Sequence, residues 1–236
     1  DVRVTMIPPA LALDDVAFAW PGRGGFSLSC PSFQIAPGER VLLLGASGSG
    51  KSTLLSLVCG IVPATRGRVL VGGTDLGAMS AGGRDRFRAE QIGVIFQQFN
   101  LLPYAKVIDN ILLPLRFAPR RRARAGGAIH EAARLCAELG LPEEVLSMPS
   151  GRLSVGQQQR VAVARALIGA PPLIVADEPT SALDAATQDH FLRLLFDRTE
   201  EAQSALLMVS HDERLAPRFD RVIRLADIVS TERSAA

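Results

Sequence analysis

The chain has 236 residues, 47% of them hydrophobic, and a formal net charge of +2 at pH 7. Such a composition argues against a disordered chain, and the balanced charge argues against a basic surface built for nucleic acid. No apolar run reaches the roughly 18 residues that span a bilayer, and the first residues lack the apolar core of a secretory signal. We therefore expect an ordinary soluble globular protein, for which any membrane association must be through a partner and nucleic acid is not the main partner.

Short runs rich in Val, Ile and Leu alternate with longer helical patterns along the whole chain. This alternation is typical of an α/β protein with a mostly parallel sheet that is covered on both faces. The strands are predicted, in chain order, at residues 41–44, 92–96, 173–176 and 205–209, with a weaker one at 221–225.

A glycine-rich segment follows the strand at 41–44 and matches the pattern G-x-x-x-x-G-K-[ST] from Gly45 to Ser52. Glycines permit a tight path that turns backbone N–H groups toward a phosphate, and the positive end of the following helix adds to this. Lys51 is expected to reach the β- and γ-phosphates of ATP, and the Ser52 hydroxyl to bind Mg²⁺. The residues predicted to bind the nucleotide here are Gly45, Ala46, Ser47, Gly48, Ser49, Gly50, Lys51, Ser52 and Thr53.

Strand patterns vanish between residues 97 and 150, where apolar residues recur at helical spacing until Gly140. We expect a helical subdomain there. Within it, the arginine-rich segment 116–127 contains a proline and a glycine pair, and we interpret it as an exposed loop between helices rather than as a site for an anion.

Two adjacent carboxylates, Asp177 and Glu178, end the apolar run LIVAD and begin the segment EPTSALD. Ligands of open α/β folds bind at the carboxyl ends of the strands. Asp177 is therefore expected to hold Mg²⁺ and Glu178 to polarise the attacking water. The alternative is that Asp177 and Glu178 merely cap a helix, which is less compatible with a phosphate-binding loop in the same chain.

The segment LSVGQQQR, residues 153–160, resembles the signature sequence of the ATP-binding cassette (ABC) family. The resemblance extends over nearly the whole chain. It includes Gln97 after a strand, SALD after the carboxylates and VSHD near residue 211. It implies one domain, 1–236, with a phosphate-loop NTPase core (1–96 and 171–230), an N-terminal antiparallel β subdomain and a helical subdomain (97–170).

In this family two cassettes pack head to tail, so the signature residues Ser154, Gly156 and Gln157 are expected to face ATP bound to the partner copy. The resemblance also implies that Gln97 senses Mg²⁺ and the attacking water, that Asp184 couples the two sites, and that His211 contacts the γ-phosphate. The family usually has glycine where this chain has Val155, which is tolerated if that position is already helical.

The resemblance also implies an aromatic residue that stacks on adenine, at the position of the segment VAFAWPG. Trp20 is favoured over Phe18, with a packing role as the alternative for either ring. Three widely spaced cysteines, Cys30, Cys59 and Cys136, suggest reduced packing residues, and two histidines, His130 and His190, are assigned to the surface.

The segment FQQFNLLPYAKVIDNILLPL resembles the bacterial branch that serves lipoprotein release and macrolide export. We expect a subunit that energises a separate transmembrane permease, bound at an apolar cluster of Phe99, Leu101, Leu102 and Tyr104, with a place in the core as the alternative for part of the cluster. The alternatives are an amino-acid-type importer, a soluble ABC ATPase not involved in transport, and a regulatory subunit, which an intact Glu178 disfavours.

Overall fold

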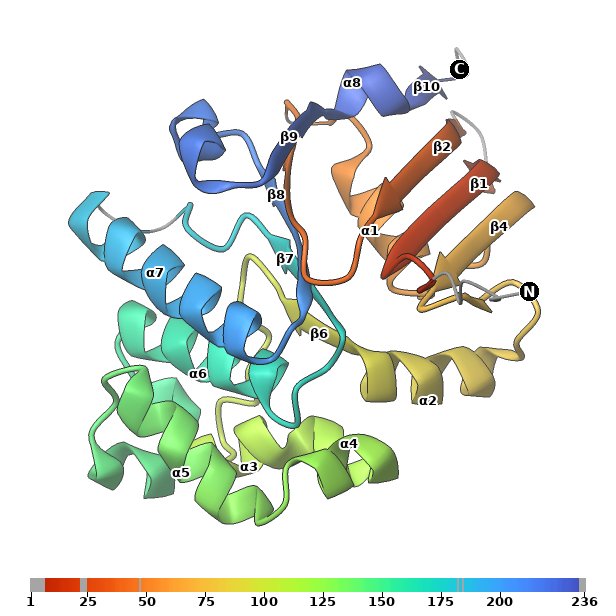
Figure 1. Ribbon diagram of the computed structural model, residues 1–236. Coiled ribbons are helices and arrows are strands. Elements are labelled where there is room, and N and C mark those ends of the chain that lie inside the picture. The colour runs from red at the N-terminus through yellow and green to blue at the C-terminus, as the bar shows by residue number, and fades with distance from the viewer. Residues whose placement is uncertain (1–6, 22–24, 47, 182, 184, 234–236) are drawn as a thin grey trace, which may run out of the picture.

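A parallel sheet lies at the centre of the structure, a computed structural model that describes residues 7–21, 25–46, 48–181, 183 and 185–233 (Figure 1). The spatial order of its strands is β6 (Ile92–Ile95), β7 (Leu173–Asp177), β8 (Ala205–Ser210), β3 (Arg40–Leu44) and β9 (Arg221–Arg224). All neighbouring pairs run parallel. The predicted strands are thus confirmed, with ends that differ by one residue at most.

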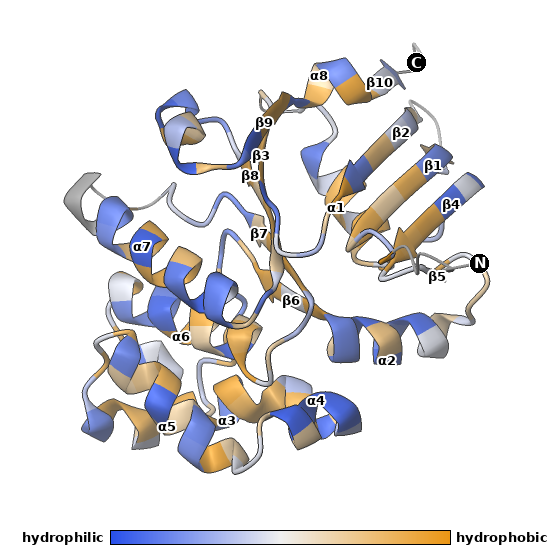
Figure 2. Ribbon diagram, in the orientation of Figure 1, coloured by the Kyte–Doolittle hydropathy of each residue, from blue (hydrophilic) through white to orange (hydrophobic). Residues whose placement is uncertain are grey.

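The strands β6, β7, β8 and β3 are buried on both faces, which explains why they are apolar without alternation, whereas the edge strand β9 is largely exposed. Along β3, Val41 and Leu43 pack into one hydrophobic core, whereas Leu42 and Leu44 pack into another on the opposite face. Figure 2 shows these central strands as hydrophobic and the helices around them as mixed. The flanking helices are α1 (Lys51–Val58), α2 (Ala81–Gln91), α7 (Ala185–Glu201), η4 (Glu213–Arg218) and α8 (Leu225–Ile228).

A separate antiparallel sheet packs beside this core (Figure 1). Its order is β10 (Ser230–Arg233), β2 (Phe26–Ile35), β1 (Leu11–Ala19), β4 (Arg66–Val71) and β5 (Thr74–Asp75). The predicted antiparallel subdomain is confirmed, but it is not purely N-terminal, because β10 pairs with β2 from the other end of the chain. Long-range strand pairing of this kind leaves no local pattern in the sequence.

The helices of the segment 107–167 lie together below the parallel sheet in Figure 1. They are α3 (Val107–Leu112), η1 (Leu113–Arg116), α4 (Pro119–Arg124), α5 (Ala128–Glu138), η2 (Glu143–Ser147), η3 (Ser150–Arg152) and α6 (Val155–Leu167). As predicted, the run ends at Gly140, whose φ of 69° is a left-handed conformation that favours glycine. None of the helices in the described part of the chain combines the length and the apolar character needed to cross a membrane.

The cysteines and two of the histidines occupy the environments that their sequence contexts predict. Cys30, Cys59 and Cys136 are buried free thiols, and burial raises the pKa of Cys59 to about 12. His130 and His190 are exposed on α5 and α7. The environments of these five residues therefore give no indication of a catalytic or metal-binding role.

The prediction of a loop at 116–127 is wrong, although most of the segment is exposed as predicted. Pro119 begins α4, and the Glu90 carboxylate accepts the backbone N–H groups of Arg120 and Arg121, at 3.0 and 2.8 Å, at the start of this helix. Arg121 itself is 1% exposed. Its guanidinium donates to five carbonyl oxygens at or just beyond the ends of α2 and α6, those of Ala89, Ile92, Arg165, Ala166 and Ile168.

The carbonyls at a helix C-terminus lack partners within the helix and carry partial negative charge, so a guanidinium is a fitting cap for them. Arg121 caps two helices at once. Burial lowers the pKa of Arg121 to about 9, which still leaves it charged at neutral pH. A buried contact between distant segments, rather than the composition of 116–127, therefore decides that this segment is ordered.

Replacing Arg121 by methionine is expected to lower the free energy of unfolding by about 2 kcal/mol or more, because buried carbonyls lose their donors. Arg122→Met, on the exposed side of the same helix, is the matched control and is expected to change it by less than about 0.5 kcal/mol. Urea denaturation followed by circular dichroism measures both. Equal effects of the two substitutions would contradict the assignment of Arg121 as a double helix cap.

Candidate functional site

The carboxyl ends of the parallel strands open into a cleft of about 750 Å³. Loops that follow β3, β6, β7 and β8 meet there, as expected where parallel strands end at one edge of a sheet. The cleft is lined by Trp20, Phe26, Gly48, Gly50, Lys51, Ser52, Thr53, Gln97, Asp177, Glu178 and His211. Most of the nucleotide, metal and catalytic residues predicted within one copy of the chain are thus brought together.

The glycine-rich loop turns sharply from β3 into α1. Gly48 and Gly50 have φ angles of 77° and 99°, which residues with a side chain rarely adopt. A side chain at Gly50 would also lie 3.0 Å from the Phe26 ring. Within the turn, the Ser49 hydroxyl donates to the carbonyl of Ala46 at 2.7 Å, and Ser47 lies outside the described residues.

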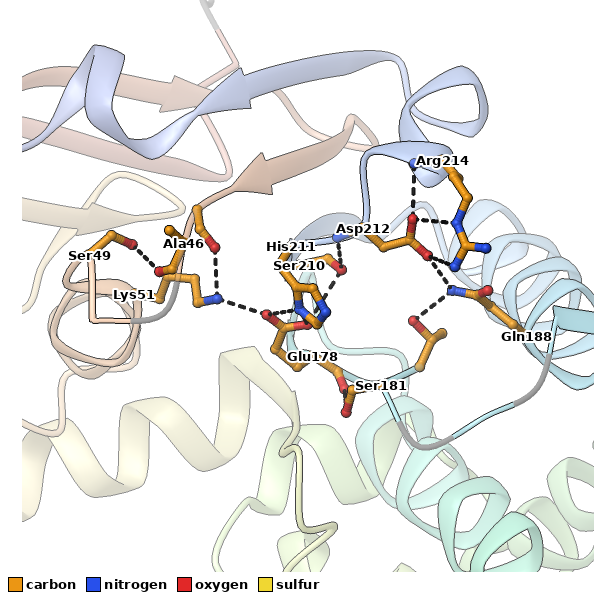
Figure 3. Close-up of polar contacts among 12 residues, drawn as sticks. Ala46, Ser49, Lys51, Glu178, Ser181, Gln188, Ser210, His211, Asp212 and Arg214 are labelled. Atoms are coloured by element: carbon orange, nitrogen blue, oxygen red, sulfur yellow. Dashed lines mark hydrogen bonds and ion pairs between the residues drawn. The ribbon is translucent and has the colours of Figure 1, made fainter.

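Glu178 is the most highly connected carboxylate of the cleft (Figure 3). The Lys51 ammonium donates to its Oε1 at 2.7 Å and to the carbonyl of Gly45 at 2.8 Å. The His211 Nδ1 lies 3.0 and 2.9 Å from the two carboxylate oxygens, and the Ser210 hydroxyl donates at 3.4 Å. The phosphate loop, the end of β7 and the end of β8 therefore meet at one side chain.

The same contacts determine the protonation of Glu178, which is 6% exposed. Burial alone raises the pKa of a carboxyl, but the hydrogen bonds and charges of Lys51 and His211 outweigh it, and the pKa of Glu178 lies below its usual value. The backbone at Glu178 has a φ of 46°, unusual for a residue with a side chain. Strained backbone of this kind persists where surrounding contacts enforce it, commonly at functional sites.

Asp177 differs from its neighbour. Burial and the charge of Glu178 raise the pKa of Asp177, and Lys51 only partly opposes this shift. Within the described residues, no group of three or more His, Cys, Asp and Glu side chains could enclose a metal ion. A cation in the cleft would thus take Asp177, the Ser52 hydroxyl and oxygen atoms of a bound ligand, a donor set that suits Mg²⁺.

The Trp20 ring forms one wall of the cleft, and its position is fixed from two sides. The indole N–H donates to the Thr53 hydroxyl at 3.1 Å, and the ring packs edge to face on Phe18 with centroids 5.0 Å apart. Trp20 is 43% exposed and Phe18 is 8% exposed. Of the two aromatic candidates, Trp20 is therefore the ring that can stack on a base, and Phe18 supports it.

The signature residues Ser154, Gly156 and Gln157 are not among those that line the cleft. They form the start of α6, where the Ser154 hydroxyl accepts the Gln157 N–H at 3.3 Å and the Gln157 side chain accepts the Ser154 N–H at 3.0 Å. Such a capping box stabilises a helix start. Val155 is the first helical residue, so the departure from glycine falls where a β-branched residue is tolerated. Asp184 lies outside the described residues.

Comparison with known proteins decides the family. A family model described as "ABC transporter" matches residues 28–181. The "Lipoprotein-releasing system ATP-binding protein LolD" of Syntrophotalea carbinolica is 42% identical over 85% of this chain and 86% of its own length. The chain belongs to the ABC transporter family.

A second relative and a solved structure are also similar to this ABC ATPase. The "Macrolide export ATP-binding/permease protein MacB" of Rhodopirellula baltica is 39% identical over 83% of the chain, which spans 28% of that longer protein. A solved structure described as a dimeric, post-hydrolysis state of the ATP-binding cassette MJ0796 bound to ADP and Pi has a TM-score of 0.83 and 33% identity. It covers 96% of this chain, and 99% of its own length is matched.

Sequence reasoning missed several residues that organise the site of this ABC ATPase. Ser210 bonds both to Glu178 and to the backbone N–H of Asp212, and only its place in VSHD pointed toward it. Asp212 is held by Arg214 and Gln188, which lowers the pKa of Asp212 (Figure 3). The contacts of Ser210 with Glu178 and of Gln188 with Asp212 have no signal in spacing or composition, because each joins separate elements, whereas Arg214 lies only two residues after Asp212.

Proposed function

We propose that this chain is the ATP-hydrolysing subunit of a membrane transporter, that it works as a head-to-tail homodimer, and that it energises a separate transmembrane permease. The observation that carries the proposal is the convergence of Lys51, Glu178 and His211 in one cleft. The solved relative is dimeric and bound to ADP and Pi, and LolD and MacB relatives belong to lipoprotein-releasing and macrolide-export systems. A lipoprotein-release or macrolide-export type of machine is therefore the branch that we favour.

The chemistry assigned to the cleft is hydrolysis by a water molecule. Lys51 and the backbone N–H groups of the glycine-rich loop bind the phosphates, and Trp20 stacks on the adenine. A triphosphate competes with Glu178 for the Lys51 ammonium, so ATP binding frees the carboxylate to accept a proton from the attacking water. His211 orients that carboxylate and contacts the γ-phosphate.

Mg²⁺ is proposed as the cofactor, held through Ser52, Asp177 and Gln97 together with the nucleotide. When bound, it neutralises charge on the β- and γ-phosphates. The Asp177 carboxyl, whose pKa is raised by burial and by Glu178, is the group that a divalent cation would keep ionised.

The head-to-tail dimer follows from where the signature residues lie. Ser154 begins α6 outside the cleft, at a helix N-terminus of the kind that attracts anions. A second copy can supply this helix start to the γ-phosphate bound at Lys51. We assign the subunit to the cytoplasmic face of the bacterial inner membrane, attached through the permease.

The permease surface predicted at residues 99–104 needs correction. Phe99 is 8% exposed, and Leu101 packs against the core, so these two residues stabilise the fold. Leu102 and Tyr104 remain exposed. The structure also contains an apolar groove of about 540 Å³, whose lining includes Ile61, Val94, Phe96, Leu113, Pro114 and Phe117.

The groove is lined by residues of α2, β6 and η1, and β6 leads directly to the loop that carries Gln97. Among the residues that line the groove, Ile61 and Phe117 are exposed apolar side chains, and Arg86 and Arg88 are basic. Exposed apolar grooves of this kind commonly receive a partner. We therefore place the permease contact in the groove and propose that it extends to Leu102 and Tyr104.

The test of this function uses the membrane protein encoded by the reading frame next to this one. Changing Ile61 and Phe117 together to glutamate is expected to abolish co-purification with that protein and the stimulation of hydrolysis by it. Basal ATP hydrolysis stays nearly intact, because neither residue contacts the cleft. Leu102→Glu with Tyr104→Glu tests the extension in parallel. Unchanged assembly in both double variants would exclude these surfaces, and no assembly in the parent protein would exclude that permease.

A further inference from the structure

The loop directly after Gln97 has an unusual backbone. Phe99 and Asn100 have φ angles of 59° and 48°, both in the left-handed region. Asparagine tolerates this region, whereas phenylalanine does so only where other contacts enforce it. Two consecutive left-handed residues therefore require an external restraint on the loop that carries Gln97.

Arg165 supplies that restraint from α6. Its guanidinium donates to the carbonyl of Phe99 at 2.5 Å and to that of Asn100 at 2.8 Å. The side chain is 8% exposed, and none of the ion pairs between described residues includes Arg165. The two loop carbonyls are therefore what compensates this buried charge, and the planar guanidinium fixes both at once.

The helix that carries Arg165 also contacts the catalytic carboxylate segment. Gln159, buried on α6, donates to the carbonyl of Pro179 at 2.5 Å, one residue after Glu178. The same helix begins at Ser154. One rigid element thus connects the signature residues, the Glu178 segment and the Gln97 loop.

We propose that Arg165 is a positioning residue that sets where Gln97 enters the cleft and makes the Gln97 loop move together with α6. The proposal rests on the role of Gln97 in hydrolysis proposed above. Gln97 is exposed and follows β6 by two residues, so the contacts that restrain its position come from the loop behind it. Losing the Arg165 clamp leaves the phosphate loop and Glu178 in place but lets Gln97 occupy many positions.

The test is a double-mutant cycle on ATP turnover with Gln97→Ala, Arg165→Met and the combined variant. A misplaced catalytic group costs roughly 10- to 100-fold in rate, so each single variant is expected to lose that much kcat while the affinity for ATP changes less than about twofold. If Arg165 acts through Gln97, the combined variant is no slower than Gln97→Ala alone. Arg165→Lys keeps the charge but not the two-pronged geometry, and is expected to recover part of the rate.

Arg124→Ala is the matched control, because Arg124 also donates to two backbone carbonyls, that of Gly169 just beyond the end of α6 and that of Glu90 near the end of α2, yet neither carbonyl belongs to the Gln97 loop. It is expected to keep the parent kcat. Multiplying losses in the combined variant, a parallel fall in ATP affinity, or an equal loss in Arg124→Ala would overturn the proposal.

Two further results separate this inference from the proposed function. If Gln97→Ala alone keeps the parent rate, the role of Gln97 is wrong and the positioning role of Arg165 with it, while the ATPase assignment stands. Should Arg165→Met fail to fold, the cycle is run with Arg165→Lys, whose loss must likewise vanish in the Gln97→Ala background. A loss that persists there contradicts the proposal.

Discussion

Replacing Glu178 by glutamine is expected to lower ATP turnover by at least about 10²-fold, the usual contribution of a general base. The amide is nearly isosteric but cannot take a proton from water. Affinity for ATP is retained, because the phosphates bind to Lys51 and the glycine-rich loop rather than to Glu178. ATP-bound dimers accumulate as a result, which size-exclusion chromatography with ATP and Mg²⁺ detects.

Glu138→Gln serves as the control for this variant. Glu138 is also an ion-paired carboxylate, bound to Arg134 and Arg198, but it lies on α5 away from the cleft. Its turnover is expected to match the parent. If Glu178→Gln hydrolysed ATP at the parent rate, Glu178 would not be the base.

Lys51→Ala is expected to lose nucleotide binding, since it removes the cation that the loop directs at the phosphates. Ser154→Arg is expected to keep binding and lose hydrolysis, because it blocks the helix start that a second copy presents. Quenching of Trp20, the sole tryptophan of the chain, reports binding in both variants. Retained ATP binding by Lys51→Ala would contradict the assignment of the phosphate loop.

Mixing these two inactive variants tests whether the site is shared. In a head-to-tail dimer of one copy of each, one site combines both defects and the other has an intact loop and an intact helix start. The mixture can therefore regain at most one of its two sites. Full activity of the mixture, or a rate per subunit that does not depend on protein concentration, would exclude this dimer.

The parts of the site that the sequence predicted are those built within a few consecutive residues. The turn around Gly50 and the carboxylates at the end of β7 are local, because strand, loop and helix follow one another directly. Strand positions in the parallel sheet were predictable for a related reason. A strand buried on both faces is apolar throughout, whatever its neighbours are.

The parts that could not be predicted depend on contacts between distant segments. Arg121 resembled its exposed neighbours in a basic segment, and only the carbonyls of α2 and α6 show why it is buried. Phe99 was predicted to be exposed because it lies in the loop that leads from the sheet to the helical subdomain. It is 8% exposed, and Arg165 on α6 binds its carbonyl. Alternation along β1 could not separate Trp20 from Phe18 either, because a hydrogen bond to Thr53 on α1 distinguishes them.

The pairing of β10 with β2 has a consequence for the newly made chain. In the sheet that leads to Trp20, β1 and β2 are synthesised long before Ser230–Arg233, which complete its outer edge. Until those residues emerge, the edge of β2 is an unpaired strand that can pair with another chain. A polypeptide cut short before β10 therefore retains the whole glycine-rich loop and Glu178, yet exposes a surface prone to aggregation. Quality control by chaperones and proteases acts on such exposed edges.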